Sequence, residues 1–112
     1  MSESQRYPTI ILAGADPAWM FDMQKHLRAL VGWDYDLLLT FSASQAMRYV
    51  TQRKVRLLIT EATFLRRTEG SGEELARRAR EHTTDMQVLL IHDGAAPASP
   101  DITHALERQA SP

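Results

Sequence analysis

Four short, continuous apolar segments constrain most strongly what this sequence can fold into. The strands that they predict cover about 8–13, 36–41, 55–61 and 86–91, and a stretch with helical periodicity follows each of them. Continuous apolar runs, unlike alternating ones, indicate strands that are covered on both faces. The repeated order of strand and helix therefore predicts an α/β domain with a doubly wound parallel sheet.

The polar residues between these segments predict where the helices begin. Asp16 followed by Pro17 supplies an N-cap residue and then proline at the first helical position. Ser71 with Glu74 three residues later forms a capping-box pattern. The four predicted helices cover about 17–31, 43–53, 72–82 and 101–109.

The composition excludes several classes of protein. The 112 residues include no cysteine, which excludes a disulfide scaffold, a thiol nucleophile and a thiolate metal site. The formal net charge of -1 provides no overall attraction to nucleic acid or to an anionic membrane. No apolar run approaches the roughly 18 residues of a membrane span, and the N-terminus lacks the pattern of a secretory signal. We expect one cytoplasmic domain over 8–110, after a tail of residues 1–7, that binds neither nucleic acid nor membrane.

Polar residues follow three of the predicted strands. Asp16, Glu61, His92 and Asp93 come directly after them, and in parallel sheets the carboxyl ends of the strands meet at one rim. One alternative for this rim is a small hydrolase or transferase that uses His92, Asp93 and Glu61. The chain contains no HxxxH spacing and neither of the common glycine-rich nucleotide motifs, and its HxxE spacing, His104 to Glu107, does not include the rim residues, so this alternative has little support from motifs.

Five segments, in order, resemble the receiver domain of bacterial response regulators. ILAGADP is similar to the first strand and its acidic loop, GWDYD to the turn into the second strand, and SASQAM to the start of the second helix. RLLITE is similar to the third strand with the phospho-accepting aspartate, and MQVLLIH to the fourth strand with the switch serine or threonine. The resemblance covers roughly residues 8–92 and implies a flavodoxin-like fold with strand order 2-1-3-4. Because a fifth strand and helix are not evident, the sheet is expected to be truncated to four βα units. Either the domain is naturally short, or the chain is an N-terminal regulatory domain cut from a longer protein.

At the positions that carry a receiver's chemistry, this sequence departs from the family. Gly14 and Ala15 stand at the positions of the two adjacent acidic residues that hold Mg²⁺, and the neighbouring Asp16 is explained by its N-cap position. Glu61 stands at the phospho-acceptor position, either as an imitation of a phosphorylated aspartate or as a polar residue at a strand end. His92 stands at the switch position.

The family's lysine after the fifth strand also has no counterpart, since Lys25 and Lys54 are the only lysines. Phosphoryl transfer depends on the placement of metal and cations. The resemblance with these departures implies a pseudo-receiver that is not an enzyme and uses no metal or other cofactor.

Two surfaces are predicted to serve partners. With no fifth strand, the fourth would be an unprotected edge, and Val88 and Leu90 would pair with a second copy in a homodimer. Phe64 and Leu65 follow the third strand in a loop, where apolar side chains often serve a partner. We expect a phosphorylation-independent regulatory module of bacterial signal transduction that acts through protein-protein contacts, with a protein partner that the sequence does not identify.

Overall fold

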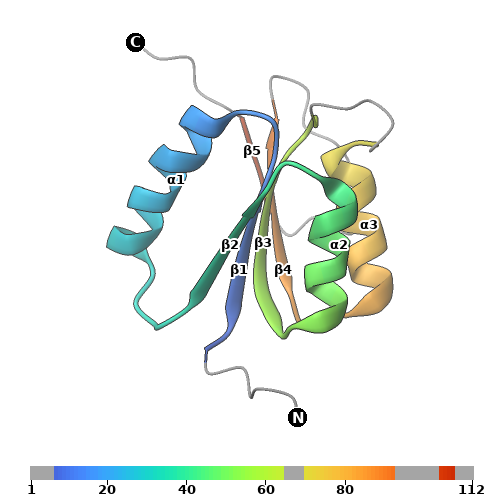
Figure 1. Cartoon of the computed structure of the whole chain (residues 1–112), viewed down its shortest axis with the longest axis horizontal. Helices are drawn as coiled ribbons and strands as arrows, with labels where there is room; N and C mark the ends of the chain where they lie inside the picture. Colours follow the sequence, from blue (N-terminus) through green and yellow to red (C-terminus); the bar gives the residue numbers. More distant parts are fainter. Residues whose placement is uncertain (1–6, 65–69, 93–103, 108–112) are drawn as a thin grey trace.

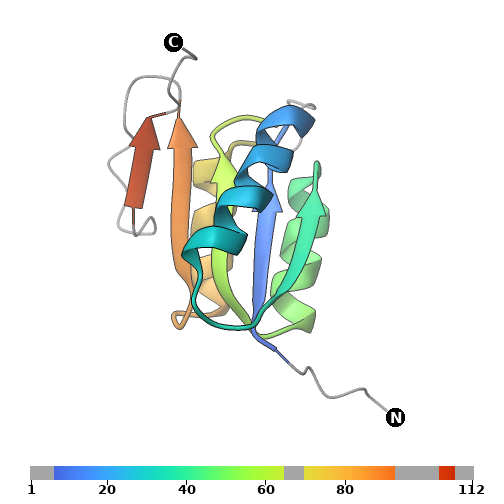
Figure 2. The same cartoon turned by 90° about the vertical axis from the view of Figure 1, so that its left-hand side faces the viewer.

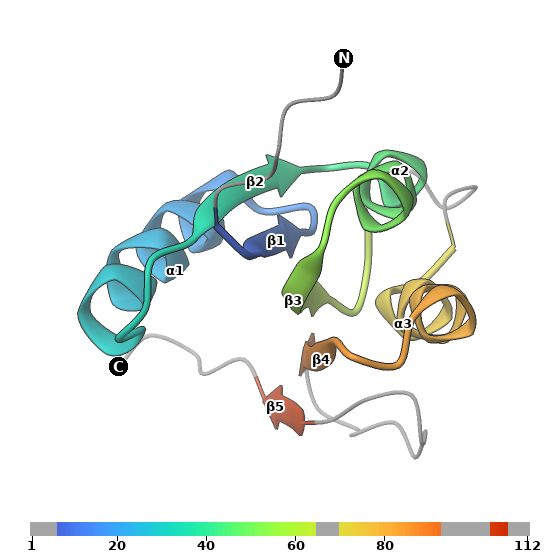
Figure 3. The same ribbon diagram turned by 90° about the horizontal axis from the view of Figure 1, so that it is seen from below.

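Three layers make up the fold, with a parallel sheet between one helix and a pair of helices (Figures 1 and 3). The computed structural model describes residues 7–64, 70–92 and 104–107. Its strands are β1 Thr9–Ala13, β2 Asp36–Thr40, β3 Val55–Glu61, β4 Gln87–His92 and β5 His104–Glu107. Its helices are α1 Pro17–Leu30, α2 Ala43–Gln52 and α3 Gly72–His82. None of these helices is long and apolar enough to span a bilayer.

The sheet has the order β2-β1-β3-β4-β5, and every neighbouring pair is parallel. The predicted order 2-1-3-4 is confirmed. All the arrowheads point the same way in Figure 2, so the carboxyl ends of the strands meet at one edge of the sheet. The loops that were expected to share a rim therefore lie at that edge.

Two apolar layers hold the helices on the sheet. The layer under α2 and α3 includes Ile11, Val50, Leu58, Leu75, Met86 and Val88. The layer under α1 includes Ile10, Leu12, Met20, Leu27, Ile59 and Ile91. Alternate residues of β1 and β3 enter opposite layers, so the sheet is buried on both faces, as its continuous apolar strands predict.

The helix predicted over 101–109 is wrong for residues 104–107, which form β5. This strand pairs in parallel with β4 over Leu89–His92. A helix of nine or so residues is marginal in water without a packed face, whereas the outer edge of β4 offers backbone partners. The other elements begin and end within one residue of their predicted bounds.

The predicted interface residues are also corrected by the fold. Because β5 covers the edge of β4, that edge is not open to a second copy. Val88, Leu90 and Phe64 are 0%, 1% and 7% exposed, so they belong to the core. A lysine at position 88 or 90 would disrupt this core and is not a test of assembly. Leu65 lies outside the described residues.

Candidate functional site at the carboxyl edge of the sheet

Glu61 is the central residue of this edge. It ends β3 and is only 5% exposed, because its side chain turns toward the loop between β1 and α1. Its Oε1 accepts hydrogen bonds from the backbone N–H groups of Ala15 (2.8 Å) and Asp16 (2.9 Å). Burial of a carboxylate is costly unless donors such as these satisfy it, so the contact fixes the side chain in one position.

The donors belong to the amino end of α1. Asp16 is the N-cap, and its Oδ1 accepts from the N–H groups of Ala18 (3.0 Å) and Trp19 (3.4 Å). The N-cap role predicted for Asp16 is confirmed. A helix amino end carries unsatisfied N–H groups and partial positive charge, which together favour an anion. Glu61 supplies that anion from within the chain.

Gly14 makes this arrangement possible. A Cβ added at this position would lie 2.7 Å from Cγ and 2.8 Å from Cδ of Glu61, and closer still to Oε1. The backbone is fixed as well, since the N–H of Gly14 donates to the carbonyl of Thr40 at 3.2 Å. No side chain fits at position 14 while Glu61 keeps its place, so the two residues form a matched pair.

The start of α3 closes in on the backbone of Glu61. A Cβ at Gly72 would lie 3.0 Å from the carbonyl carbon of Glu61 and closer still to its oxygen. Gly72 N–H donates to the carbonyl of Ala62 at 2.9 Å, and Ala62 N–H donates to that of Ile91 at 2.8 Å. These bonds tie the ends of β3, β4 and α3 together around Glu61.

The rim residues predicted from the sequence are brought together only in part. Asp16 and Glu61 are in contact through the backbone bond already described. His92 ends β4, one position beyond Ile91, which pairs with Glu61. The side chain of His92 and all of Asp93 lie outside the described parts of the chain.

The family's Mg²⁺ does not fit the residues at this edge. Gly14 and Ala15 offer no side-chain oxygen, and Oε1 of Glu61 already accepts two hydrogen bonds. Within the described residues, no three acidic, histidine or cysteine side chains are grouped as metal ligands. The site is instead an internal pairing of a carboxylate with a helix terminus.

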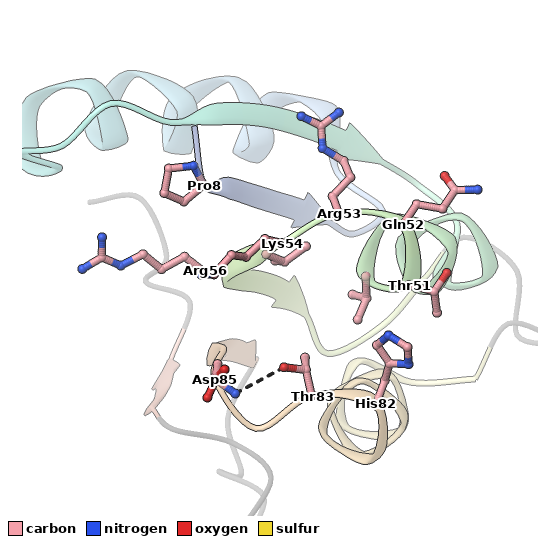
Figure 4. Close-up of a pocket in the computed structure, with 11 residues that line it drawn as sticks. Pro8, Thr51, Gln52, Arg53, Lys54, Arg56, His82, Thr83 and Asp85 are labelled. Carbon is pink, nitrogen blue, oxygen red and sulfur yellow. Dashed lines mark hydrogen bonds between the residues drawn. The ribbon is translucent and has the colours of Figure 1, made fainter. Parts of the chain in front are cut away.

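A second cavity lies at the opposite, amino edge of the sheet (Figure 4). It measures about 640 Å³, and its lining includes Thr51, Arg53, Lys54, Arg56, His82 and Asp85. Two of its cations have partners within the fold. Arg53 pairs with Asp36 at 2.9 Å, and Arg56 lies 4.4 Å from the ring centre of Trp33. No sequence motif predicts this cavity, because its residues come from the ends of separate elements.

Comparisons with known proteins agree with the fold. Neither a family model nor a curated protein matches this sequence. RcsB from Salmonella enterica serovar Typhimurium, solved on promoter rprA with the phosphomimetic BeF3-, is 17% identical with a TM-score of 0.75 over 96% of this chain and 63% of its own. The isolated REC domain of RcsB is 16% identical, with a TM-score of 0.73 over 95% of this chain and 80% of its own.

A third similar structure is the signal receiver domain of an HD domain-containing protein from Pseudomonas fluorescens Pf-5. It is 20% identical, with a TM-score of 0.66 over 92% of this chain and 83% of its own. This chain spans 63%, 53% and 56% of three of the RcsB chains. These likenesses establish a receiver-like fold.

Proposed function

We propose that this chain is a pseudo-receiver, a regulatory module of bacterial signal transduction that works through protein contacts and is not phosphorylated. The observation that carries the proposal is the bond of Glu61 Oε1 to the N–H groups of Ala15 and Asp16. At the position of a phospho-acceptor, the carboxylate faces inward and is buried. A phosphodonor in solution would therefore have little access to this carboxylate.

The residues that would support phosphoryl transfer are replaced in a coordinated way. The space that a side chain at position 14 would need is occupied by Glu61 itself. Loss of the acidic pair and lengthening of the acceptor from aspartate to glutamate thus depend on one another. A module of this kind holds one conformation of the β1–α1 loop. Its signalling output then depends on how much of the protein is made or on the binding of its partner.

Glu61 was predicted to be either an imitation of a phosphorylated aspartate or a polar residue at a strand end, and the geometry supports a third role, an internal anion that fixes the loop. An imitation of a phosphorylated aspartate would present its charge to the switch position. The carboxylate instead bonds to the amino end of α1, on the side of β3 where β1 lies. The alternative hydrolase or transferase is disfavoured for the same reason, since a base needs an accessible oxygen.

We also propose that the module is a homodimer. One similar structure is described as two RcsB dimers bound to two parallel DNAs, which is a property of that protein. For this chain the absence of nucleic-acid binding stays a prediction based on its net charge of -1. That the chain is the N-terminal regulatory domain of a longer protein stays a second proposal, supported by its covering 63% of an RcsB chain.

Titration with Mg²⁺ tests the proposed inactive site. Isothermal calorimetry of the whole chain is expected to show no binding at millimolar Mg²⁺. The triple variant Gly14→Asp, Ala15→Asp, Glu61→Asp introduces hard oxygen ligands and shortens the side chain beside position 14 by one methylene, so it is expected to gain binding. Circular dichroism confirms that the variant is folded. Saturable Mg²⁺ binding by the unmodified chain would contradict the proposal.

A further inference from the structure

β2 is an edge of the sheet, and its outer backbone groups have no partner among the described residues. Asp36 N–H donates to Pro8 and the carbonyl of Thr40 accepts from Gly14, so the even-numbered residues of β2 face β1. Backbone groups alternate along a strand. The N–H and C=O groups of Leu37 and Leu39 therefore point outward from the sheet.

Exposed apolar side chains lie beside this edge. Leu39 is 38% exposed and Phe41 is 42% exposed. Leu39 pairs with Leu12, which is buried under α1, so Leu39 extends from the α1 face of the sheet, and Phe41 follows directly after the end of β2. Figure 2 looks onto this face, with β2 at its right margin.

Phe21 on α1 continues the same apolar surface. Leu30 lines a cavity together with Arg56 and Leu57 of β3. The side of α1 that carries Leu30 therefore faces β3. Phe21 lies roughly two and a half turns before Leu30, on the opposite flank and hence toward β2. Its side chain is 64% exposed, which is unusual for phenylalanine unless a partner covers it.

The strand lacks the features that protect an edge. Its sequence, DLLLT, contains neither lysine nor proline. Its one charge, on Asp36, is paired with Arg53 at 2.9 Å. The other edge, β5, is four residues long and includes His104 and Glu107. An unprotected apolar edge is a template for another strand.

We infer that β2 pairs antiparallel with β2 of a second copy, about a two-fold axis at Leu38. This register overlaps all five residues of the strand. Leu37 and Leu39 of one copy then exchange backbone hydrogen bonds with Leu39 and Leu37 of the other, and the two Leu38 side chains meet. Every central pair is leucine with leucine, and no like charges face one another.

The surface beside the strand adds to this contact. A specific interface usually buries roughly 800 Å² per partner, which is more than a five-residue strand supplies. A two-fold axis perpendicular to the sheet leaves both α1 helices on one face, so Phe21 and Phe41 of each copy extend the interface. The inference deepens the proposed homodimer and is independent of Glu61.

Cysteine cross-linking tests the register directly, because the natural chain has no cysteine. Opposite residues in a non-hydrogen-bonded pair have Cα atoms about 4.5 Å apart, within the range of a disulfide. Leu38→Cys is expected to form a covalent dimer under mild oxidation, on a non-reducing gel. Leu30→Cys is the control, since Leu30 is 79% exposed on the other flank of α1. The inference would be overturned if the chain is a dimer but Leu38→Cys forms no more covalent dimer than Leu30→Cys does.

Light scattering coupled to size exclusion provides the second test. The unmodified chain is expected to be a dimer at micromolar concentration, and Leu39→Lys is expected to weaken dimerisation at least about tenfold. Leu30→Lys, with the same change at an exposed leucine, is expected to remain dimeric. A folded, unmodified chain that is monomeric at about 100 µM would overturn the inference. It would leave the proposal on phosphorylation unaffected, since that is read from Mg²⁺ binding and mass.

Discussion

Gly14 and Glu61 explain one another at the scale of single residues. Taken alone, Gly14 reads as a lost metal ligand and Glu61 as a lengthened acceptor. In the structure the carboxylate occupies the space beside Gly14 and bonds to Ala15 and Asp16. The two residues form one internal contact, and its contribution to the free energy of unfolding can be measured by mutation.

Gly14→Ala is expected to lower the free energy of unfolding by about 1–3 kcal/mol, because the new methyl group overlaps Glu61. Gly32→Ala is the matched control, since nothing lies within 4 Å of a Cβ there, and it should stay within about 0.5 kcal/mol of the unmodified chain. Urea denaturation measures both. In a Glu61→Ala background the cost of Gly14→Ala should shrink, and additive costs would contradict the matched pair.

Glu61→Gln is expected to keep the fold, because its side-chain carbonyl can still accept from Ala15 and Asp16. Loss of the charge should cost about 1 kcal/mol. Glu61→Ala leaves the two partly buried N–H groups of Ala15 and Asp16 without this acceptor and should cost more, about 1–3 kcal/mol in total. Thermal and urea denaturation compare the two. Equal stability of the Gln and Ala variants would show that the hydrogen bonds do not hold the loop.

At the scale of elements, the sequence predicted the strands and helix ends that depend on nearby residues. Continuous apolar runs located β1 to β4, and the cap roles expected for Asp16 and Ser71 are present, with Ser71 Oγ accepting from Glu74 N–H at 3.1 Å. Residues 104–107 were mispredicted because pairing with β4 outweighs their local preference. Glu61 is bonded to Asp16 and Ala15, which precede it in the sequence by 45 and 46 positions. No local sequence pattern encodes such a contact.

Gly72→Ala tests how closely α3 approaches β3. A Cβ there would meet the backbone of Glu61, which cannot move without breaking the sheet. We expect a loss of about 2–3 kcal/mol in the free energy of unfolding, although alanine normally favours a helix. Urea denaturation measures the free energy of unfolding of Gly72→Ala, with Gly32→Ala as the control. Stabilisation by Gly72→Ala would mean that α3 lies farther from β3 than described.

At the scale of the whole molecule, the described sheet has β2 at one edge and β5 at the other. β5 covers β4, so the edge that the sequence argument offered for assembly is internal. We infer that assembly uses β2 instead, where Leu37 and Leu39 present their backbone groups outward. The carboxyl edge is meanwhile occupied by the side chain of Glu61, which supports the proposed role in protein contacts.

Intact-mass analysis after treatment with acetyl phosphate and Mg²⁺ tests the central claim most directly. We expect no phosphoryl adduct, which would add about 80 Da, because Glu61 is buried against the amino end of α1 and Gly14 and Ala15 offer no side-chain oxygen to a metal. Lysine acetylation by the reagent gives a different mass and is therefore distinguishable. A stoichiometric phosphoryl adduct on Glu61 would contradict the account.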